Sequence, residues 1–579
     1  MKMRTLMNFS FVTAGLLLVG GASAQVHVDS RNQTGTENGS TLNPYRTVQA
    51  AVDAAAEGEE VRVATGTYNE DVLVMNKAVQ LLGGYAGGST VQYDTATAGD
   101  FVSRDPEANI TELSGTGAES VISLLEAGES VVDGFRITGG GGSTTDAFRS
   151  SGGGIFARNG APVIRNNTIQ GNDARRGDLE SFGGGIASDA ATITIEDNDI
   201  SENTAGRGAG ISAVRGTVII RNNTVRGNVA VGDHGGGIYV GAPSAVITGN
   251  RVFENEIGRA LGYGWGGGIM VFNSGNTAYL SFNEVFSNFA AGQGAGVFVD
   301  EAATAVLENE LIYGNEVNPG QASGGAVYVD GGEVEGVPTG SNVTIINCTI
   351  AANTAAETYV GGNGLLIEGL SEVTMRNSIL WGNGDDEVYV LPGSTLAATY
   401  SNSAEAIAGT GNISADPLFA DMAMNDFHLQ STEGRWDPAA NGGAGAFVVD
   451  AATSPSIDAG DPADSFANEE EPNGGRVNQG AYGNTAEASL TPEAGEGEGE
   501  GEGEGEGEGE GEGEGEGEGE GEGEGEGEGE GEGEGEGEGN GCNPAKALQR
   551  EARNVRGDLL MFAVAGLGLV GWSRMSRRD

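Results

Sequence analysis

Cysteine and basic residues are scarce in this chain. Only two of its 579 residues are Cys, Cys348 and Cys542, and they lie far apart in different segments. This excludes a disulfide framework, and we expect Cys348, within a β-branched stretch, to be a small buried side chain. Lys and Arg number 29 against 84 Asp and Glu, which gives a formal net charge of −55. Because acidic surfaces repel nucleic acid and anionic membrane surfaces, neither is an expected partner.

Residues for acid–base chemistry are also few. Of the three His, only His234, in the stretch GDHGGG, falls within the repeats described below. The sequence has no paired-Asp motif and no Gly-His-Gly, and no spacing matches a known calcium loop such as the EF-hand. Asp233 and His234 are catalytic candidates, although an Asp-His pair in a turn is more often solvated surface. Asp173 and Arg175, in a charged insertion, are the other candidates, for calcium or for substrate.

Glycine, in contrast, is abundant, with 104 residues, and it recurs in a repeated unit over residues 152–383. Each unit has a Gly-rich turn such as GGGIF or GAGVF, a short apolar strand, a second strand ending in Asn, and a further Asn five or six residues later. The spacing of this outer Asn varies from 25 to 38 residues. A fixed motif with elastic spacing is typical of a solenoid whose insertions fall in loops. The outer asparagines are Asn172, Asn203, Asn228, Asn255, Asn288, Asn315, Asn353 and Asn383.

The strands of this unit predict the fold class. They are short, β-branched and alternating, as in ITI at residues 193–195, and most units have no room for a helix. We therefore predict an all-β fold, a right-handed parallel β-helix whose coils stack about 4.8 Å apart. Stacked Ile and Val would fill the core, and stacked Asn amides would hydrogen-bond to one another and to the turn backbone. The alternative is a sandwich of antiparallel hairpins, with Asn-Gly turns roughly every 8–12 residues.

The ends of the chain predict export and anchoring. Residues 1–24 have a positive start, an apolar stretch and a small-residue cleavage site ending at Ala24, which is typical of a secretory signal. Residues 491–539 are mostly a Gly-Glu alternation that cannot be buried, so we expect a disordered spacer, or else an expanded repeat with no selected role. Residues 540–579 contain an apolar stretch at 559–572 followed by three Arg. This predicts a membrane helix, short against the about 20 residues of a stable span, with the domain outside the cell.

Between these segments, residues 25–490 are expected to form the β-helix domain. Residues 25–100 would hold the N-terminal cap and first coils, including a short amphipathic helix near residues 48–55 that covers an otherwise open strand edge. The regular repeats occupy residues 152–383. Residues 400–490, rich in Asp-Pro, Asn-Gly and Gly-Asp pairs, are expected to be the final coils and a C-terminal cap.

Aromatic residues recur directly after the Ile or Val of the Gly-rich turn. If that Ile points inward, the aromatics form an outward strip, and exposed rings on a rigid sheet can stack on sugars. Plain β-propensity is the alternative. The ligand-binding candidates in this strip are Phe156, Tyr239, Phe298 and Tyr328. A second register, two residues before the outer Asn, is expected to stack within the solenoid and stabilise its turns: Phe253, Phe286, Tyr313 and Trp381.

Charged residues also recur at one position of the repeat. Arg165 and Arg221 occupy the same register two coils apart, with Glu196 between them. We expect a charge ladder along one face rather than a catalytic site.

These motifs resemble known families over about residues 26–490. The GGGI turns and NNT strands resemble right-handed parallel β-helix repeat proteins of the pectin-lyase-like superfamily, and TVQAAVDAA with VATGTYNE resembles the opening coil and cap of bacterial members. The segments GTGNISADPLFAD, SPSIDAGDP and NGGRVNQGAYGNT resemble the end of a choice-of-anchor domain, from which the insert at residues 433–453 departs. The end of the chain is similar to bacterial C-terminal sorting signals, which implies cleavage by a membrane protease near Cys542 and transfer to the cell surface.

The resemblance implies several function classes. Many relatives cleave acidic polysaccharides, either as lyases with an Arg or Lys base and calcium-holding carboxylates, or as hydrolases with paired Asp. Because those motifs are not found here, we expect non-catalytic binding or structural display at the cell surface or outer membrane, with carbohydrate as the ligand. A polysaccharide lyase or glycoside hydrolase is the alternative, and a protein adhesin with a flat apolar patch is the third. No cofactor is expected, with calcium as the alternative.

Overall fold

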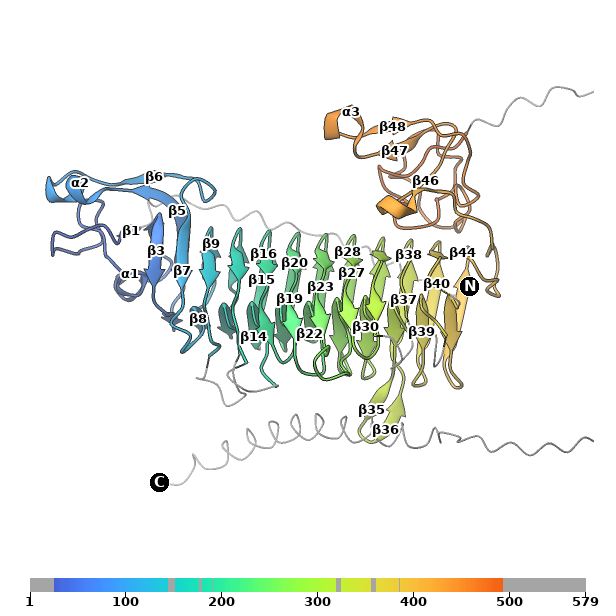
Figure 1. The fold of residues 1–579 in the computed structure, drawn as a ribbon, viewed down its shortest axis with the longest axis horizontal. Coiled ribbons are helices and arrows are strands. Elements are labelled where there is room, and N and C mark those ends of the chain that lie inside the picture. Colours follow the sequence, from blue (N-terminus) through green and yellow to red (C-terminus); the bar gives the residue numbers. More distant parts are fainter. Residues whose placement is uncertain are drawn as a thin grey trace, which may run out of the picture. The chain divides into compact units, whose positions relative to one another are not determined.

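The computed structural model describes residues 25–143, 151–175, 180–189, 191–318, 324–355, 361–384 and 386–492. These residues form a solenoid in which successive coils pass through the same sheets (Figure 1). Strands of neighbouring coils pair in parallel throughout the three large sheets, so the sandwich of antiparallel hairpins is wrong and the parallel β-helix is confirmed.

Several predicted segments lie outside the described residues. They are the signal peptide ending at Ala24, the Gly-Glu run, Cys542 and the helix at residues 559–572. Among the residues that the structure describes, no helix is both long and apolar enough to span a bilayer.

Each coil contributes one strand to each large sheet. The strands of each sheet are given below in the order in which they pair. Sheet 1 consists of β1 (Gln25–Val28), β2 (Glu60–Ala64), β5 (Gln80–Gly87), β9 (Val131–Asp133), β12 (Val163–Arg165), β15 (Thr192–Glu196), β19 (Thr217–Arg221), β23 (Ser244–Thr248), β27 (Thr277–Ser281), β31 (Thr304–Glu308), β37 (Asn342–Ile346), β40 (Glu372–Arg376) and β43 (Thr395–Thr399), with β6 (Asp100–Arg104) antiparallel to β5. Sheet 2 consists of β3 (Gly66–Asn69), β7 (Thr111–Ser114), β10 (Arg136–Thr138), β13 (Thr168–Gln170), β16 (Asp199–Ser201), β20 (Thr224–Arg226), β24 (Arg251–Phe253), β28 (Glu284–Phe286), β32 (Leu311–Tyr313), β38 (Thr349–Ala351), β41 (Ile379–Trp381) and β44 (Asn402–Ser403).

Sheet 3 follows the Gly-rich turns, and the short sheet 4 precedes them. Sheet 3 consists of β4 (Val72–Met75), β8 (Ile122–Leu125), β11 (Ile155–Arg158), β14 (Ile186–Asp189), β18 (Ile211–Val214), β22 (Ile238–Gly241), β26 (Ile269–Phe272), β30 (Val297–Asp300), β34 (Val327–Val329), β39 (Leu365–Ile367) and β42 (Val388–Val390). Sheet 4 consists of β17 (Thr204–Ala205), β21 (Val229–Ala230), β25 (Glu256–Ile257), β29 (Phe289–Ala290) and β33 (Glu316–Val317).

Alternation along the strands fills the core, as predicted. In β22, for example, Ile238 and Val240 lie fully buried in the main core, whereas Tyr239 between them belongs to a separate cluster outside the sheet. The same register places Ile211 and Ile269 above and below Ile238. Stacked β-branched side chains therefore form one continuous core along the solenoid.

Two asparagine ladders close the turns beside sheet 2. In the outer ladder, both the amide N–H and the Nδ2 of Asn228 donate to Oδ1 of Asn255, at 3.1 and 2.9 Å, and its Nδ2 also donates to the carbonyl of Ile200. The pattern repeats from coil to coil until Glu387, whose carboxylate accepts from Asn383. Every buried amide of the ladder thus has a partner, and the predicted Asn stacking is confirmed.

The inner ladder runs five residues before the outer one. It starts at Asn167 and ends where Asn283 donates to Glu310. In the next coil the buried Cys348 occupies the corresponding position, and its Sγ faces the carbonyls of Leu307 and Ile346. Cys348 is therefore the small buried side chain that the sequence predicts.

The N-terminal end is covered by a helix at the predicted place. Helix α1 (Val48–Ala54) begins after Thr47, whose side chain accepts from the N–H of Ala50, and it buries Val48, Ala51 and Val52 in the main core. A second short helix, α2 (Thr90–Asp94), lies between β5 and β6. The amphipathic spacing seen in the sequence therefore serves to close the first coils.

The C-terminal region, residues 416–492, folds back over sheet 2 (Figure 1), and we call it the C-terminal cap. Its hairpins are β45 (Phe419–Asp421) with β46 (Asp426–Leu429), and β47 (Arg435–Asp437) with β48 (Ala446–Val448), with a 3-10 turn (Met422–Met424) and α3 (Ala440–Gly443) in their loops. Phe419, Phe427 and Leu429 pack against Tyr313 and Ala351 of sheet 2. The insert at residues 433–453 forms the second hairpin. A further hairpin, β35 (Gly332–Val334) with β36 (Val337–Thr339), projects from the solenoid.

Candidate functional site

Four loop residues form a row over the outer face of sheet 3. Each lies directly before a Gly-rich turn, and backbone bridges join Phe182 to Arg207 and His234 to Trp265 on adjacent coils. The N–H of Gly208 donates to the carbonyl of His234 at 3.2 Å, which links the two pairs. We call Phe182, Arg207, His234 and Trp265 the pre-turn row.

The pre-turn row and the turns cover the aromatic strip. The side chains of the strip point away from the main core, but only 1–2% of each is exposed: Phe156, Tyr239, Phe298 and Tyr328. The prediction of an exposed strip is therefore wrong. From Gly152 to Gly324, each Gly-rich turn starts with a left-handed Gly and folds tightly over the strip, so that a Cβ on Gly235 would lie 2.8 Å from the Cβ of Tyr239. The alternation of side chains along a strand predicts which face of the sheet each one points to. It does not predict whether a loop covers that face.

Two of the predicted catalytic residues, Asp233 and His234, meet beside Arg207 of the pre-turn row. Nε and Nη2 of Arg207 lie 2.7 and 3.0 Å from the two carboxylate oxygens of Asp233. Nδ1 of His234 lies 2.8 Å from Oδ1 of Asp233. Burial by itself raises the pKa of Asp233, but His234 and Arg207 more than offset this and hold the pKa well below its usual range. Asp233 is therefore ionised at all ordinary pH values.

Aromatic rings surround this charged cluster. The ring of His234 lies 5.1 Å from Phe272 edge to face, 5.6 Å from Trp265 and 6.4 Å from Tyr239, between centroids. Arg207 lies over the ring of Phe182 at 5.7 Å. The sequence identified Asp233 and His234 but missed Arg207, which would have been found by aligning the residues that precede each Gly-rich turn.

This cluster lacks features that glycoside cleavage and nucleophilic catalysis require. A glycosidase needs two carboxylates about 5–9 Å apart. Both oxygens of Asp233 contact Arg207, and one also contacts His234, so Asp233 is an ionised, paired carboxylate and cannot be the proton donor of such a pair. Ser212 lies under the neighbouring turn that starts at Gly208, and its buried Oγ makes no hydrogen bond there, so no nucleophile–base pair forms.

Asp173 and Arg175 form a separate pair at the edge of sheet 4. Nε and Nη2 of Arg175 lie 2.8 and 2.6 Å from the Asp173 carboxylate, and both side chains are more than two-fifths exposed. The bond from Arg175 holds the pKa of Asp173 below its usual value. No hydrogen bond or ion pair among the described residues connects this pair with Asp233 or His234, so the four catalytic candidates do not form one site.

A row of carboxylates lies further along sheet 3. Asp300, Asp330 and Glu368 follow equivalent strand positions on three successive coils, and the Tyr328 hydroxyl donates to Asp330 and Glu368. Burial and the neighbouring carboxylates Asp330 and Glu301 raise the pKa of Asp300, and burial raises that of Glu368. Within the described residues, no three His, Cys, Asp or Glu side chains are arranged to hold a metal ion. A role for calcium stays a prediction.

Exposed aromatic rings occur at other positions, one of which is Tyr389 on the last strand of sheet 3, at 41% exposed. Tyr279 in β27 is 49% exposed, and Phe282, in the turn that follows, is 56% exposed. In sheet 2, Phe253 and Phe286 stack at 4.7 Å and Phe286 and Tyr313 at 4.9 Å, nearly parallel, which confirms the predicted stack for these three rings. Trp381 does not join it, because Ala351 occupies this register on the coil between Tyr313 and Trp381. The sequence missed Tyr279 and Phe282 because neither belongs to a recurring aromatic position.

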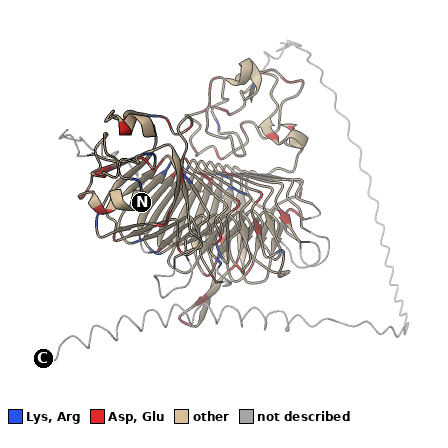
Figure 2. Ribbon diagram, turned by 60° about the vertical axis from the view of Figure 1, so that its left-hand side comes forward, with Lys and Arg blue, Asp and Glu red and all other residues tan. Residues whose placement is uncertain are grey.

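The charge ladder is found where the sequence predicts it. Arg165, Glu196 and Arg221 are paired in register on successive strands of sheet 1. Asp133 extends the ladder by contacts of 2.8 Å to Arg165 and 2.5 Å to Arg104. Figure 2 shows Lys and Arg interspersed with Asp and Glu along the solenoid. Within the ladder, Glu196 forms ion pairs with both Arg165 and Arg221.

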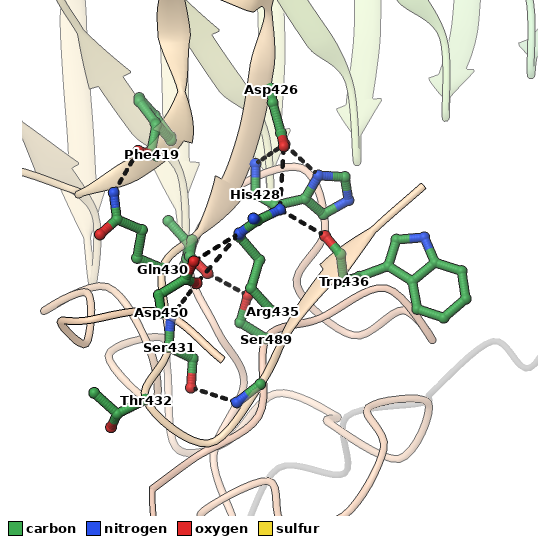
Figure 3. Close-up of polar contacts among 12 residues, drawn as sticks. Phe419, Asp426, His428, Gln430, Ser431, Thr432, Arg435, Trp436, Asp450 and Ser489 are labelled. Carbon is green, nitrogen blue, oxygen red and sulfur yellow. Dashed lines mark hydrogen bonds and ion pairs between the residues drawn. The ribbon is translucent and has the colours of Figure 1, made fainter. Parts of the chain in front are cut away.

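A second polar network holds the C-terminal hairpins together (Figure 3). The Arg435 guanidinium lies between Asp426, at 3.1 Å, and Asp450, at 3.2 Å. Nδ1 of His428 lies 2.7 Å from Asp426, and its ring stacks on Tyr482 at 3.7 Å. Burial lowers the pKa of His428, but Asp426 and Glu487 outweigh it and keep the pKa above its usual value. These contacts all join parts of the C-terminal cap to one another, so we assign them to stability.

The repeat also matches a protein family. The family model described as "Right handed beta helix region" matches residues 107–285 and 267–413, which together are more than half of the chain. The chain belongs to the right-handed β-helix family. A comparison of this β-helix protein with curated proteins gives no match. A solved structure described as "The complex structure of XylC with xylose" is 12% identical over 72% of this chain and 91% of that chain, with a TM-score of 0.41, a similarity too low to bear on function.

Proposed function

We propose that this protein is an exported β-helix, anchored at the cell surface, that binds a carbohydrate without cleaving it. The proposal combines the β-helix fold with the sequence features of the two ends: a secretory signal ending at Ala24, a Gly-Glu spacer, and a sorting signal with Cys542. The choice-of-anchor resemblance of the C-terminal coils supports the same assignment. The domain from residue 25 to 490 would carry the binding surface.

The observation that carries the non-catalytic assignment is the state of Asp233. Its two oxygens are engaged by Arg207 and His234, so this carboxylate is ionised and held in an ion pair. General acid–base cleavage of a glycosidic bond needs one carboxyl group that gives a proton and another that accepts one or attacks. An Arg that acts as a base must also be free of such a partner. Asp233 has no proton to give, and Arg207 is paired with Asp233, so neither side chain suits these catalytic roles.

The test is to incubate the full-length chain with acidic and neutral polysaccharides, with and without calcium. We expect retention of the protein on at least one polymer in a pull-down, without release of reducing or unsaturated ends. Release of either kind of end would contradict the proposal. Binding to no polymer would contradict the carbohydrate assignment.

A polysaccharide lyase or glycoside hydrolase is the second candidate, favoured by the Arg207–Asp233–His234 cluster itself. If ends are released, Asp233→Asn and His234→Ala should each abolish the release. Asp173→Asn, which breaks an ion pair outside the cluster, is the matched control and should leave it unchanged.

A protein adhesin is the third candidate, favoured by one row on sheet 1. Ile219, Val246, Tyr279 and Val306 occupy the same outward position on four successive strands. Such a row is flat, apolar and partly exposed. A surface protein that is retained by cells of another kind, but by none of the polysaccharides, would favour this candidate.

A further inference from the structure

The turn between sheets 1 and 2 places one residue per coil in the left-handed region. From β12 to β43 the φ of this residue lies between +48° and +64°. Asn, Asp and Gly adopt this conformation at little cost, whereas bulky side chains do so rarely and under strain. The nine residues are Asn166, Asp197, Asn222, Gly249, Phe282, Asn309, Asn347, Asn377 and Tyr400. Phe282 and Tyr400 are therefore the exceptions.

The surroundings of Tyr400 explain why it is tolerated. Nε2 of Gln479 donates to its carbonyl at 2.7 Å, and the guanidinium of Arg476 lies 5.3 Å from its ring centroid. Both partners belong to the C-terminal cap. The strain at Tyr400 is thus offset by contacts that hold the cap on the solenoid.

Phe282 has no such compensation. Its φ is +56°, more than half of its side chain is exposed, and no other ring or guanidinium in the described part of the chain packs on it. A strained residue that contributes little to packing points to a function outside the fold.

The residues on the two neighbouring coils leave the ring of Phe282 uncovered on one side only. On the preceding coil the equivalent residue is Gly249, which has no side chain to cover the ring. On the following coil Asn309 is buried, because its Nδ2 donates to the carbonyls of Ala481 and Gly483, each at 2.8 Å. Phe282 therefore lies beside the edge of the cap, open on one side and bounded on the other. Tyr279, three residues earlier on the same coil, adds a second half-exposed ring.

The polar groups around these rings include one exposed carboxylate, Glu308, which is in register with Ser281 and whose backbone carbonyl accepts from the N–H of Phe282. Oγ of Ser281 donates to Oγ1 of Thr248 at 3.0 Å, so hydroxyls lie beside the rings. The nearest charges on β24 and β28 are Arg251 and Glu284, which form an ion pair at 2.7 Å. With a net charge of −55, the chain disfavours an anionic polymer.

We infer that Phe282 and Tyr279 form a binding platform for a neutral polysaccharide. An aromatic face carries partial negative charge and attracts the C–H face of a pyranose, and the adjacent hydroxyls match those of the sugar. This inference rests on the proposed carbohydrate-binding function and names its surface and its class of ligand. Rigid coils hold the two rings in place, so binding would cost little ordering of the protein.

The experiment compares four full-length proteins: the natural chain, Phe282→Asn, Tyr279→Ser and Tyr389→Ser. Asn is the residue found at the equivalent positions 222 and 309, so Phe282→Asn should keep or raise the midpoint of thermal unfolding. Binding to a mixed-linkage β-glucan, a galactomannan and dextran is measured by titration, with polygalacturonate as the acidic polymer. We expect both Phe282→Asn and Tyr279→Ser to weaken binding of a neutral polymer at least tenfold. Tyr389→Ser, at an exposed ring on the last strand of sheet 3, is the matched control and should bind as the natural chain does.

Each other outcome overturns a distinct statement. If the natural chain binds no polysaccharide, the proposed function fails. If it binds a neutral polymer equally well after both substitutions, the platform is wrong while the proposed function stands. Binding to polygalacturonate alone would contradict the ligand class. A lower unfolding midpoint for Phe282→Asn would show that Phe282 stabilises the fold, and the argument from strain would be wrong.

Discussion

At the scale of single residues, Glu310 is the least expected member of the ladders. It is fully buried, and its Oε1 accepts from the N–H and Nδ2 of Asn283, at 3.1 and 2.8 Å. A carboxylate has no N–H to donate to the next coil, so the inner ladder of amides stops here. Burial raises the pKa of Glu310 to about 8. The folded protein therefore keeps a proton on Glu310 at neutral pH.

This proton makes stability depend on pH. The unfolded chain loses it near the ordinary value of about 4.3, whereas the folded chain holds it up to about 8. The contribution of Glu310 to the free energy of unfolding is therefore greatest at low pH and falls as the pH rises between these values. By pH 8 the free energy of unfolding has decreased by on the order of 4–5 kcal/mol. We expect Glu310→Gln, which keeps the acceptor and removes the titration, to flatten this decline and to raise the unfolding midpoint at pH 8.

Denaturation curves between pH 4 and 9 measure the effect. Glu308→Gln is the matched control, because Glu308 is exposed and lies only two residues away. It should leave the pH dependence unchanged. If Glu310→Gln follows the same pH profile as the natural chain, then Glu310 is not protonated in the folded state.

At the scale of the coil, the outer Asn ladder is the element that closes each turn. Asn228 receives two hydrogen bonds from Asn203 and gives two to Asn255. Asn228→Ala would leave the Asn203 donors and the carbonyl of Ile200 buried without partners. At about 1–3 kcal/mol for each such group, we expect a loss of roughly 3–6 kcal/mol in the free energy of unfolding.

Urea denaturation checks this expectation against Asn222→Gly. Asn222 is exposed, and its left-handed φ suits Gly, so that substitution should change stability by less than about 1 kcal/mol. Equal effects of the two substitutions would mean that the turn conformation, and not the ladder, supplies the stability.

The coil is also the scale at which the sequence was most informative. The repeated Asn and the alternating Ile and Val predicted the ladders and the inward rows, because both depend only on local spacing. The burial of Tyr239 could not be predicted, because it depends on how the loop before Gly235 folds back over the strip. Three residues were missed because they differ from the residue type recurring at their position of the coil: Arg207, Phe282 and Glu310. Aligning the coils by register, rather than by motif, brings such departures to light.

At the scale of the whole molecule, the two Cys have opposite expected roles. Cys348 is buried in the inner ladder, where burial raises its thiol pKa far above the ordinary value and keeps it unreactive. Cys542 lies in the proposed sorting signal, next to the proposed membrane helix. If the chain is cut near Cys542 and transferred to the surface, the mature protein should lack the residues that follow.

We therefore expect Cys542→Ala to retain residues 543–579 and to accumulate with the inner membrane, whereas Cys348→Ala should be processed as the natural chain is. Intact-protein mass spectrometry of cell fractions gives the C-terminal residue in each case, and a mass above that of the cut protein would additionally report a lipid. If the natural chain keeps its C-terminal residues and remains at the membrane, then the C-terminal segment is a retained anchor and not a sorting signal. In both cases the proposed Gly-Glu spacer would separate the β-helix from the lipid, because its 22 glutamates would repel an anionic surface. The platform of Tyr279 and Phe282 would then remain open to a polymer.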